Sequence, residues 1–294
     1  PIAWPYFSNN WLDGRVHFPS HDVGVISRTG RTPFVRLMAR SGWGRGADPN
    51  FTLRSIDAGV WDPELTGWCD AARATGIPLL AEFGTEVNGD WFPWNGRWNG
   101  GGRTTGYGDP ALADGPERFR DAYRRIVDIC RARGALNITW FFHVDVGGWP
   151  PAPWNRIASY WPGARYVDWI GLSDYGPQRP GERWVSFRDR LDRAYGRIAA
   201  LAPRKPIAVL EYGASEDPRH PRAKARWIRD AIRAVARHRW PRIAALSYWH
   251  ETWRNPGGSL SDLRIDSSRR AERAYRRGIA RRVFTSRPRF TPAR

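Results

Sequence analysis

The sequence is poor in lysine, cysteine and methionine. Among 294 residues there are 47 lysines and arginines, but only Lys205 and Lys224 are lysine, and the chain has two cysteines and one methionine. No apolar run approaches the ~18 residues that a membrane-spanning helix needs, so an integral membrane protein is excluded. Two cysteines are too few for a disulfide scaffold or a cysteine-based zinc site. We expect no metal and no cofactor.

The two cysteines each fall on the apolar face of an expected helix. Cys69 lies among Leu65, Trp68 and Ala72, and Cys130 follows a similar apolar spacing. Buried free thiols are the simpler interpretation. A disulfide between neighbouring helices stays open.

The formal net charge is +18, and nearly all of the positive charge is arginine. Abundant arginine with almost no lysine is typical of codon bias, and the arginines are spread over many helices, apart from a basic C-terminal helix and tail at about 267–294. No recognised nucleic-acid module accompanies the charge, so we expect no specific nucleic-acid partner, while non-specific polyanion binding stays open. The 18 tryptophans favour sugar stacking instead.

Short apolar runs alternate with amphipathic stretches along the whole chain, which predicts a parallel sheet covered by helices and one α/β domain over 1–294. The predicted strands are Pro1–Phe7, Pro33–Ala39, Pro78–Phe83, Asn137–Phe142, Asp168–Ser173, Pro206–Glu211 and Ile243–Trp249. Helices are predicted at Pro116–Arg133, Trp184–Leu201, Ala223–His238 and Ser267–Arg282.

Nearly every predicted strand is followed by an aromatic residue with a polar or acidic partner. The third is followed by "GTEVNGDWFPW" and the fourth by "HVDVGGW". Functional residues of such folds gather where strands end, and a carbohydrate needs rings for its faces and polar groups for its hydroxyls. The pattern predicts a sugar-binding cleft.

Four segments in this order resemble glycoside hydrolase family 26, the β-mannanase family of retaining enzymes: "EVNGDWFPWNG", "YRRIVDICRARGALNITW", "WPGARYVDWIGLSDYG" and "KPIAVLEYGAS". The resemblance implies a (β/α)8 TIM barrel in which Glu86 is the acid/base at the end of strand 4 and Glu211 the nucleophile at the end of strand 7. In the family three strands precede the strand that leads to the acid/base, but only two predicted strands precede it here. We therefore expect strand 1 upstream of Pro1, which would make this chain a truncated catalytic domain, or else another element replaces strand 1.

The chemistry agrees with this assignment independently of the family. Retaining hydrolysis needs two carboxyl groups about 5–5.5 Å apart, one protonated and one ionised. Glu86 and Glu211 are far apart in sequence, and a barrel would bring both strand ends into one mouth. A chance pair of strand-end glutamates is the structural alternative, and a rival assignment makes Glu82 the acid and Glu86 its support.

Further residues are assigned to the substrate site by the resemblance. Asn88 and Trp91 match positions that shape the sugar site, Tyr175 matches a tyrosine that hydrogen-bonds the nucleophile, and Trp249 matches an aromatic platform. Trp94, His143 and Asp145 are candidate cleft residues, for which a structural role is equally open.

Two positions depart from the family pattern. Thr85 stands where characterised mannanases usually have histidine beside the scissile bond, and we expect it to affect sugar specificity. Glu82 stands where relatives often have arginine. Because Glu82 and Glu86 have the same strand parity, both could face the barrel, and we expect Arg36 on the neighbouring strand to pair with Glu82.

The sequence thus predicts a retaining glycoside hydrolase that cleaves internal linkages of a polysaccharide, with β-1,4-mannan as the first candidate. Mixed-linkage glucan, xylan or an exopolysaccharide are alternative substrates. A carbohydrate-binding barrel without turnover is the alternative from another class. A polymer substrate implies an extracellular location.

Overall fold

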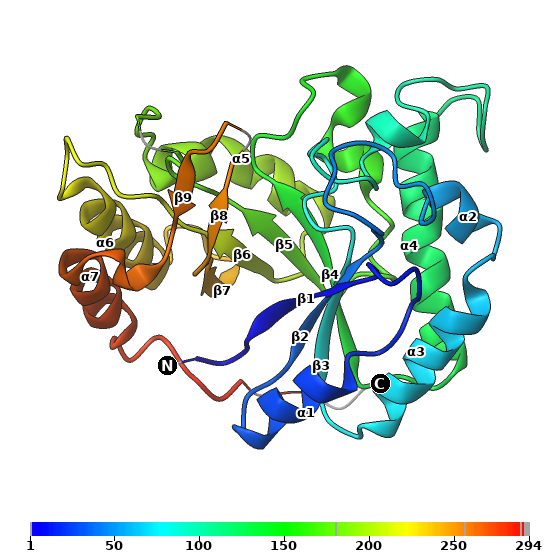
Figure 1. Cartoon of the computed structure of the whole chain (residues 1–294), viewed down its shortest axis with the longest axis horizontal. Coiled ribbons are helices and arrows are strands. Elements are labelled where there is room, and N and C mark those ends of the chain that lie inside the picture. Colours follow the sequence, from blue (N-terminus) through cyan, green and yellow to red (C-terminus); the bar gives the residue numbers. More distant parts are fainter. Residues whose placement is uncertain (1, 180, 256, 289, 291–294) are drawn as a thin grey trace. The chain divides into compact units, whose positions relative to one another are not determined.

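The computed structural model describes residues 2–179, 181–255, 257–288 and 290, and Figure 1 traces the chain. It divides into two compact units. The N-terminal unit comprises Ile2–Ile170 with the tail from Ser286, and the C-terminal unit comprises Gly171–Thr285. The single domain over 1–294 stays a prediction. Among the described residues, no helix has the length and apolar character to cross a membrane.

Four parallel strands form the centre of the N-terminal unit. They lie side by side in chain order as β1 (Tyr6–Asn10), β2 (Phe34–Met38), β3 (Leu79–Phe83) and β4 (Ile138–Asp145). All residues of β2 and β3 are buried, including the charged side chains of Arg36 and Glu82 among their apolar neighbours. The predicted start of the first strand, Pro1, lies outside the described residues; the paired strand begins at Tyr6, after Pro5, which has no N–H group to donate.

Helices α1 (Ser20–Arg28), α2 (Leu53–Asp57), α3 (Asp62–Ala74) and α4 (Asp114–Ala132) belong to the same unit (Figure 1). Cys69 of α3 and Cys130 of α4 form a disulfide, with 4.9 Å between their Cα atoms. The preferred interpretation as free thiols was therefore wrong. The apolar faces of α3 and α4 pack against each other, which brings the two cysteines within bonding reach.

The C-terminal unit continues the alternation of strands and helices. Its elements are β5 (Trp169–Ser173, which begins at the unit boundary), α5 (Phe187–Leu201), β6 (Ile207–Tyr212), α6 (Ala223–Ala236), β7 (Ile243–Tyr248) and α7 (Arg269–Ile279). β6 pairs with β7 in parallel, and the backbone N–H of Asp174 donates to the carbonyl of Glu211, which links the end of β5 to β6. α6 packs along α7.

Smaller elements complete both units. A hairpin of β8 (Thr252–Arg254) and β9 (Leu260–Asp262) follows β7 and was not predicted, because three-residue strands carry little periodicity. Short 3-10 turns lie at Gly96–Asn99, Pro153–Asn155, Ile157–Tyr160 and Ile265–Ser267. All seven predicted strands are present; β1 and β4 have an end that differs from the prediction by three residues or more, and the ends of the other five differ by one residue at most.

Candidate active site

The turn after β3 carries the proposed acid/base residue. Gly84 has φ +74°, and a Cβ there would lie 2.3 Å from the Phe119 ring, so the position requires glycine. Glu86 has φ +48°, a conformation that is uncommon for any residue with a side chain. Backbone strain of this kind often marks a functional site. The strand thus ends in a tight turn that redirects the chain at Glu86.

The carboxylate of Glu86 is held by a neighbouring tryptophan. The indole Nε1 of Trp91 donates to Oε2 of Glu86 at 2.6 Å, and the Trp91 ring remains 38% exposed. A Cβ at Gly89 would lie 2.1 Å from this ring. The glycine of the "NGDW" segment is therefore what allows Trp91 to fold back over its own loop onto Glu86.

Asn88 and Trp94 hold the loop after β3 in place through hydrogen bonds. The side-chain amide of Asn88 donates to the carbonyl of Asp145 and accepts from its N–H, both at 2.8 Å, which ties the loop to the end of β4. Trp94 donates from Nε1 to the carbonyl of Thr85 at 2.7 Å and is 2% exposed. Both side chains hold the loop that bears Glu86, which is a positioning role.

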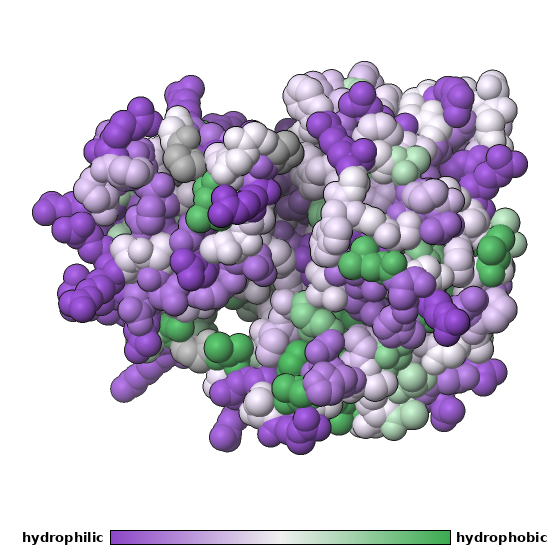
Figure 2. Space-filling model, in the orientation of Figure 1, coloured by the Kyte–Doolittle hydropathy of each residue, from purple (hydrophilic) through white to green (hydrophobic). Residues whose placement is uncertain are grey.

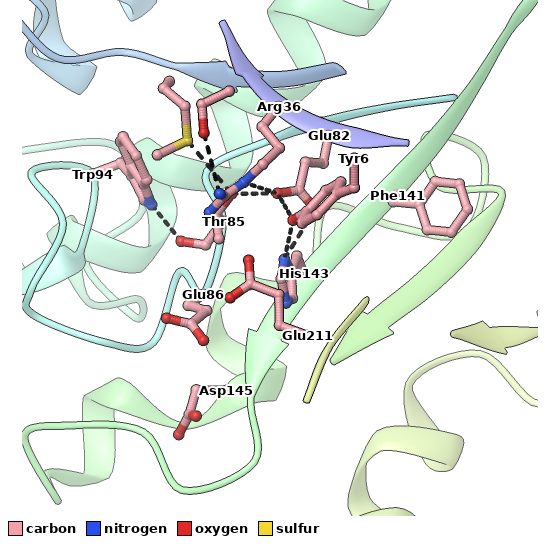
Figure 3. A network of polar contacts seen from close by, with 12 residues as sticks. Tyr6, Arg36, Glu82, Thr85, Glu86, Trp94, Phe141, His143, Asp145 and Glu211 are labelled. Atoms are coloured by element: carbon pink, nitrogen blue, oxygen red, sulfur yellow. Dashed lines mark hydrogen bonds and ion pairs between the residues drawn. The ribbon is translucent and has the colours of Figure 1, made fainter. Parts of the chain in front are cut away.

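A buried charged network lies beneath the same turn (Figure 3). Nε of Arg36 lies 3.5 Å from Oε1 of Glu82, which confirms the predicted pair. The hydroxyl of Tyr6 donates to the same oxygen at 2.5 Å, and Nδ1 of His143 lies 3.0 Å from Oε2. The hydroxyl of Thr85 also donates to Glu82. The sequence predicted the arginine partner and missed the other three.

The surroundings of Glu82 fix its protonation state. Burial alone raises the pKa of this carboxyl group. The charge and hydrogen bond of His143, the charge of Arg36 and the hydrogen bond from Thr85 outweigh burial and leave the pKa below its ordinary value. Glu82 is therefore an ionised member of a buried cluster, which argues against the rival assignment in which it donates the catalytic proton.

Thr85 and the candidate cleft residue His143 both belong to this network. The side chain of Thr85 is fully buried, donates to Glu82 and accepts from Nε of Arg36 at 3.2 Å. The hydroxyl of Thr85 thus points into the charged interior (Figure 3), and the expected effect of Thr85 on sugar specificity stays a prediction. His143 is also fully buried and is engaged with Glu82 and Tyr6.

The C-terminal unit carries the proposed nucleophile. Glu211 is the fifth of the six residues of β6, and its Oε2 accepts a hydrogen bond from the hydroxyl of Tyr175 at 2.5 Å. Nε of Arg190 binds the carboxylate of Asp174 at 2.8 Å, which anchors the segment before Tyr175 to α5. Trp249 follows β7 directly, and its N–H donates to the carbonyl of Tyr212. Tyr175 and Glu211 form the predicted pair.

Comparisons with known proteins bear on the family and the fold of the chain. Residues 63–192 match the family model of glycosyl hydrolase family 26. The chain is 31% identical over 227 residues to endoglucanase H of Acetivibrio thermocellus, a match that covers 76% of this chain and 22% of that protein. It is 27% identical over 187 residues to mannan endo-1,4-beta-mannosidase A and B of Caldalkalibacillus mannanilyticus, covering 63% and 30% of the two chains.

Among solved structures, the catalytic domain of the Bacillus sp. JAMB-750 endo-beta-1,4-mannanase matches with a TM-score of 0.63 and 19% identity, over 93% of this chain and 77% of that chain. The chain belongs to glycoside hydrolase family 26. Its fold is that of the family 26 (β/α)8 barrel, of which seven strands are described. The chain spans less than a third of the length of both curated relatives.

Within this family 26 chain, the two candidate carboxylates lie in different units. Glu86 follows β3 in the N-terminal unit, and Glu211 lies near the end of β6 in the C-terminal unit. Each receives a hydrogen bond from an aromatic donor, Trp91 in one case and Tyr175 in the other. Within the described residues, no group of three or more histidine, cysteine, aspartate or glutamate side chains is arranged to hold a metal ion.

Proposed function

We propose that this family 26 chain is a retaining glycoside hydrolase that cleaves internal β-linkages, with Glu211 as nucleophile and Glu86 as acid/base. The observation that carries the proposal is the pair of strand-end carboxylates, each held in one orientation by a hydrogen bond from an aromatic side chain. A role in catalysis explains why both are placed at carboxyl ends of strands, where barrel enzymes keep their reactive groups.

The reaction proceeds by double displacement. The carboxylate of Glu211 attacks the anomeric carbon while the bond to the leaving oxygen breaks, and Glu86 gives its proton to that oxygen. Water then attacks the same carbon with Glu86 as general base, and the bond to Glu211 breaks. Two inversions give net retention. The roles require the two carboxyl groups to approach to about 5–5.5 Å.

The aromatic partners prepare the two carboxyl groups for these roles. An indole N–H can only donate, so Trp91 requires a lone pair on Oε2 of Glu86. We therefore assign Oε2 as the accepting oxygen and place the proton that Glu86 transfers on Oε1. The phenol of Tyr175 donates to Oε2 of Glu211, which orients the carboxylate and leaves the attack to Oε1. The exposed part of the Trp91 ring is available to stack on a sugar.

The substrate class is a β-glycan, and we propose β-1,4-mannan within that class. The mannanase-like motif "NGDWFPW" and the structural match to an endo-beta-1,4-mannanase support mannan. A β-glucan is the second candidate, because the relative named endoglucanase H is 31% identical over 76% of the chain. Because the side chain of Thr85 is buried, we assign it no role in the choice between mannan and a β-glucan. A polysaccharide partner and an extracellular location follow from this proposal.

The test is hydrolysis of a panel of oligosaccharides with the anomeric configuration of the products followed by NMR. Mannohexaose, cellohexaose, xylohexaose and a mixed-linkage glucan oligosaccharide are each incubated with equal amounts of protein. We expect cleavage of mannohexaose with the β-anomer as the first product. Cleavage of a glucan alone would overturn mannan as substrate, and an α-anomer as first product would overturn the retaining mechanism.

A further inference from the structure

The positive charge of this protein is concentrated in one of its two units. Residues 171–285 contain 26 arginines and lysines against 12 aspartates and glutamates, whereas residues 2–170 contain 18 against 17. Codon bias exchanges lysine for arginine and leaves the charge unchanged, so it does not account for this excess. The C-terminal unit therefore has a charge distribution that calls for a physical explanation of its own.

Much of the excess lies on the solvent faces of two neighbouring helices. α6 and the residues flanking it expose one stripe of arginines at spacings of three and four residues: Arg222, Arg226, Arg229, Arg233 and Arg237. α7 exposes a second stripe: Arg269, Arg270, Arg273, Arg276 and Arg277. Side chains at such spacings share one face of a helix. Figure 2 shows strongly hydrophilic side chains over α6 and α7.

Close packing fixes the two stripes relative to each other. Gly278 of α7 lies so near Ile232 of α6 that a Cβ would approach it to 2.8 Å. Lys224 of α6 is buried, and its Nζ donates to the carbonyl of Arg264 and the hydroxyl of Ser267, both at 2.7 Å. The segment leading into α7 is thereby held against α6, so the two stripes lie on helices that are packed together; we refer to both stripes as the α6–α7 surface.

Few of these arginines are neutralised by the protein itself. Arg229 lies 3.5 Å from Asp230, and Arg276 lies 2.8 Å from Glu272. Within the described residues, the other eight arginines of the two stripes take part in no ion pair. Adjacent like charges repel one another, and an anionic ligand along the surface would relieve this repulsion.

We propose that the α6–α7 surface binds a linear anionic polysaccharide that carries carboxylate groups. Arginine offers paired N–H donors that match a carboxylate, and one helical turn of ~5.4 Å spaces successive arginines at intervals suited to a chain of acidic sugars. On the described residues of α6 and α7, no large apolar or aromatic side chain is exposed. The surface therefore lacks the rings that stack on unpaired bases and the apolar groups that enter a lipid bilayer.

The inference concerns binding and is independent of the two glutamates. It rests on the proposed function only for the polysaccharide nature of the ligand, because a glycan hydrolase meets acidic glycans in the same material as its substrate. The surface would hold the enzyme on mixed polysaccharides while the cleft acts on a neutral chain.

Binding to polygalacturonate, measured by calorimetry over a range of salt concentrations, tests the proposal. We expect the affinity to fall linearly on a logarithmic salt scale, as charge neutralisation requires. A variant with Arg222→Gln, Arg226→Gln, Arg233→Gln and Arg237→Gln should bind at least about tenfold more weakly and show a shallower salt slope. A second variant with the corresponding changes at Arg269, Arg270, Arg273 and Arg277 should behave alike.

The matched control removes the same charge from the nearly neutral unit, at four exposed positions: Arg15→Gln, Arg28→Gln, Arg54→Gln and Arg73→Gln. This control should bind within about twofold of the unchanged protein, because it leaves all ten arginines of the α6–α7 surface in place. Equal weakening in both sets would overturn the assigned surface. Tighter binding of double-stranded DNA or of anionic lipid vesicles than of polygalacturonate would overturn the assigned ligand class.

Circular dichroism of each variant establishes that it is folded. Hydrolysis of neutral glycans is measured in parallel, and it should be unchanged in the folded variants. If the unchanged protein hydrolyses none of the glycans, the proposed function is wrong, but a measured binding of polygalacturonate remains valid. If the unchanged protein does not bind polygalacturonate, only the proposed binding surface is wrong.

Discussion

At the scale of single residues, the sequence predicted pairings where strand parity or a motif constrained them. Arg36 and Glu82 lie opposite each other in the β2 and β3 register, as their positions in adjacent strands implied. The sequence did not reveal that His143 and Tyr6 share the same carboxylate, because β4 and β1 reach it only through the folded sheet. The sequence also did not reveal that the side chain of Thr85 is buried, because the turn at Gly84 sets the direction of that side chain.

The Arg36–Glu82 pair gives a prediction about stability. Arg36→Met alone removes one cation beside a fully buried carboxylate and should lower the free energy of unfolding by about 3 kcal/mol, the lower end of the range for such pairs, because His143 still contacts Glu82. Combining it with Glu82→Leu should cost less than the sum of the single changes. Urea unfolding of all four proteins measures the coupling, and strictly additive losses would rule out the interaction.

A second prediction concerns Asp57, whose side chain is largely buried near the end of α2. Burial and the nearby Asp121 raise its pKa to about 7, although Arg118 lies 3.9 Å away. Because the folded-state pKa is raised, the folded protein favours the protonated form. The stability that this provides is fully present below pH ~4, the ordinary pKa of aspartate, and is lost as pH rises through about 7.

Asp57→Asn should therefore raise stability relative to the unchanged protein at pH 9, on the order of 2 kcal/mol, with a smaller difference at pH 5. Chemical unfolding of both proteins between pH 5 and 9 measures this difference. Parallel pH profiles would show that Asp57 does not titrate as described.

At the scale of elements, the seven strands were predictable because each is a short apolar run bounded by proline, glycine or charged residues. The first strand, β1, was predicted to end at Phe7 but extends to Asn10, and its paired residues begin only after Pro5, which has no N–H group to donate. The small helices α1 and α2 and the β8–β9 hairpin were missed, since they are too short for a clear period. The loop after β3 was recognised by its motif, but its strained backbone at Glu86 is visible only in the structure.

The loop after β3 gives a prediction of its own. Gly89→Ala would place a Cβ against the Trp91 ring, which should swing away and lose its hydrogen bond to Glu86. We expect about a tenfold lower kcat on glycans and a smaller effect on aryl glycosides with good leaving groups, which need little proton donation. Gly67→Ala, on the open surface of α3, is the matched control and should leave kcat unchanged. Equal effects on both substrate types would contradict the role of Trp91.

At the scale of the whole molecule, family membership and barrel class were predictable from four motifs in order, and the comparisons confirmed them. The disulfide was not, because apolar helix faces suit a thiol as well as a bridge. The basic character of the C-terminal helix was apparent from the sequence, but the concentration of charge in one unit was not, because the boundary between the units at Gly171 is known only from the structure.

The central claim is that Glu211 and Glu86 are the nucleophile and the acid/base of one retaining site. Azide rescue tests it most directly, because azide attacks from opposite faces of the sugar in the two cases. With an activated aryl β-glycoside, Glu211→Ala should regain activity with azide and give the α-glycosyl azide, since the covalent step is bypassed. Glu86→Ala should form the enzyme-bound intermediate and give the β-glycosyl azide. Turnover on polymer close to that of the unchanged protein in either variant, or the same azide anomer from both, would contradict the account.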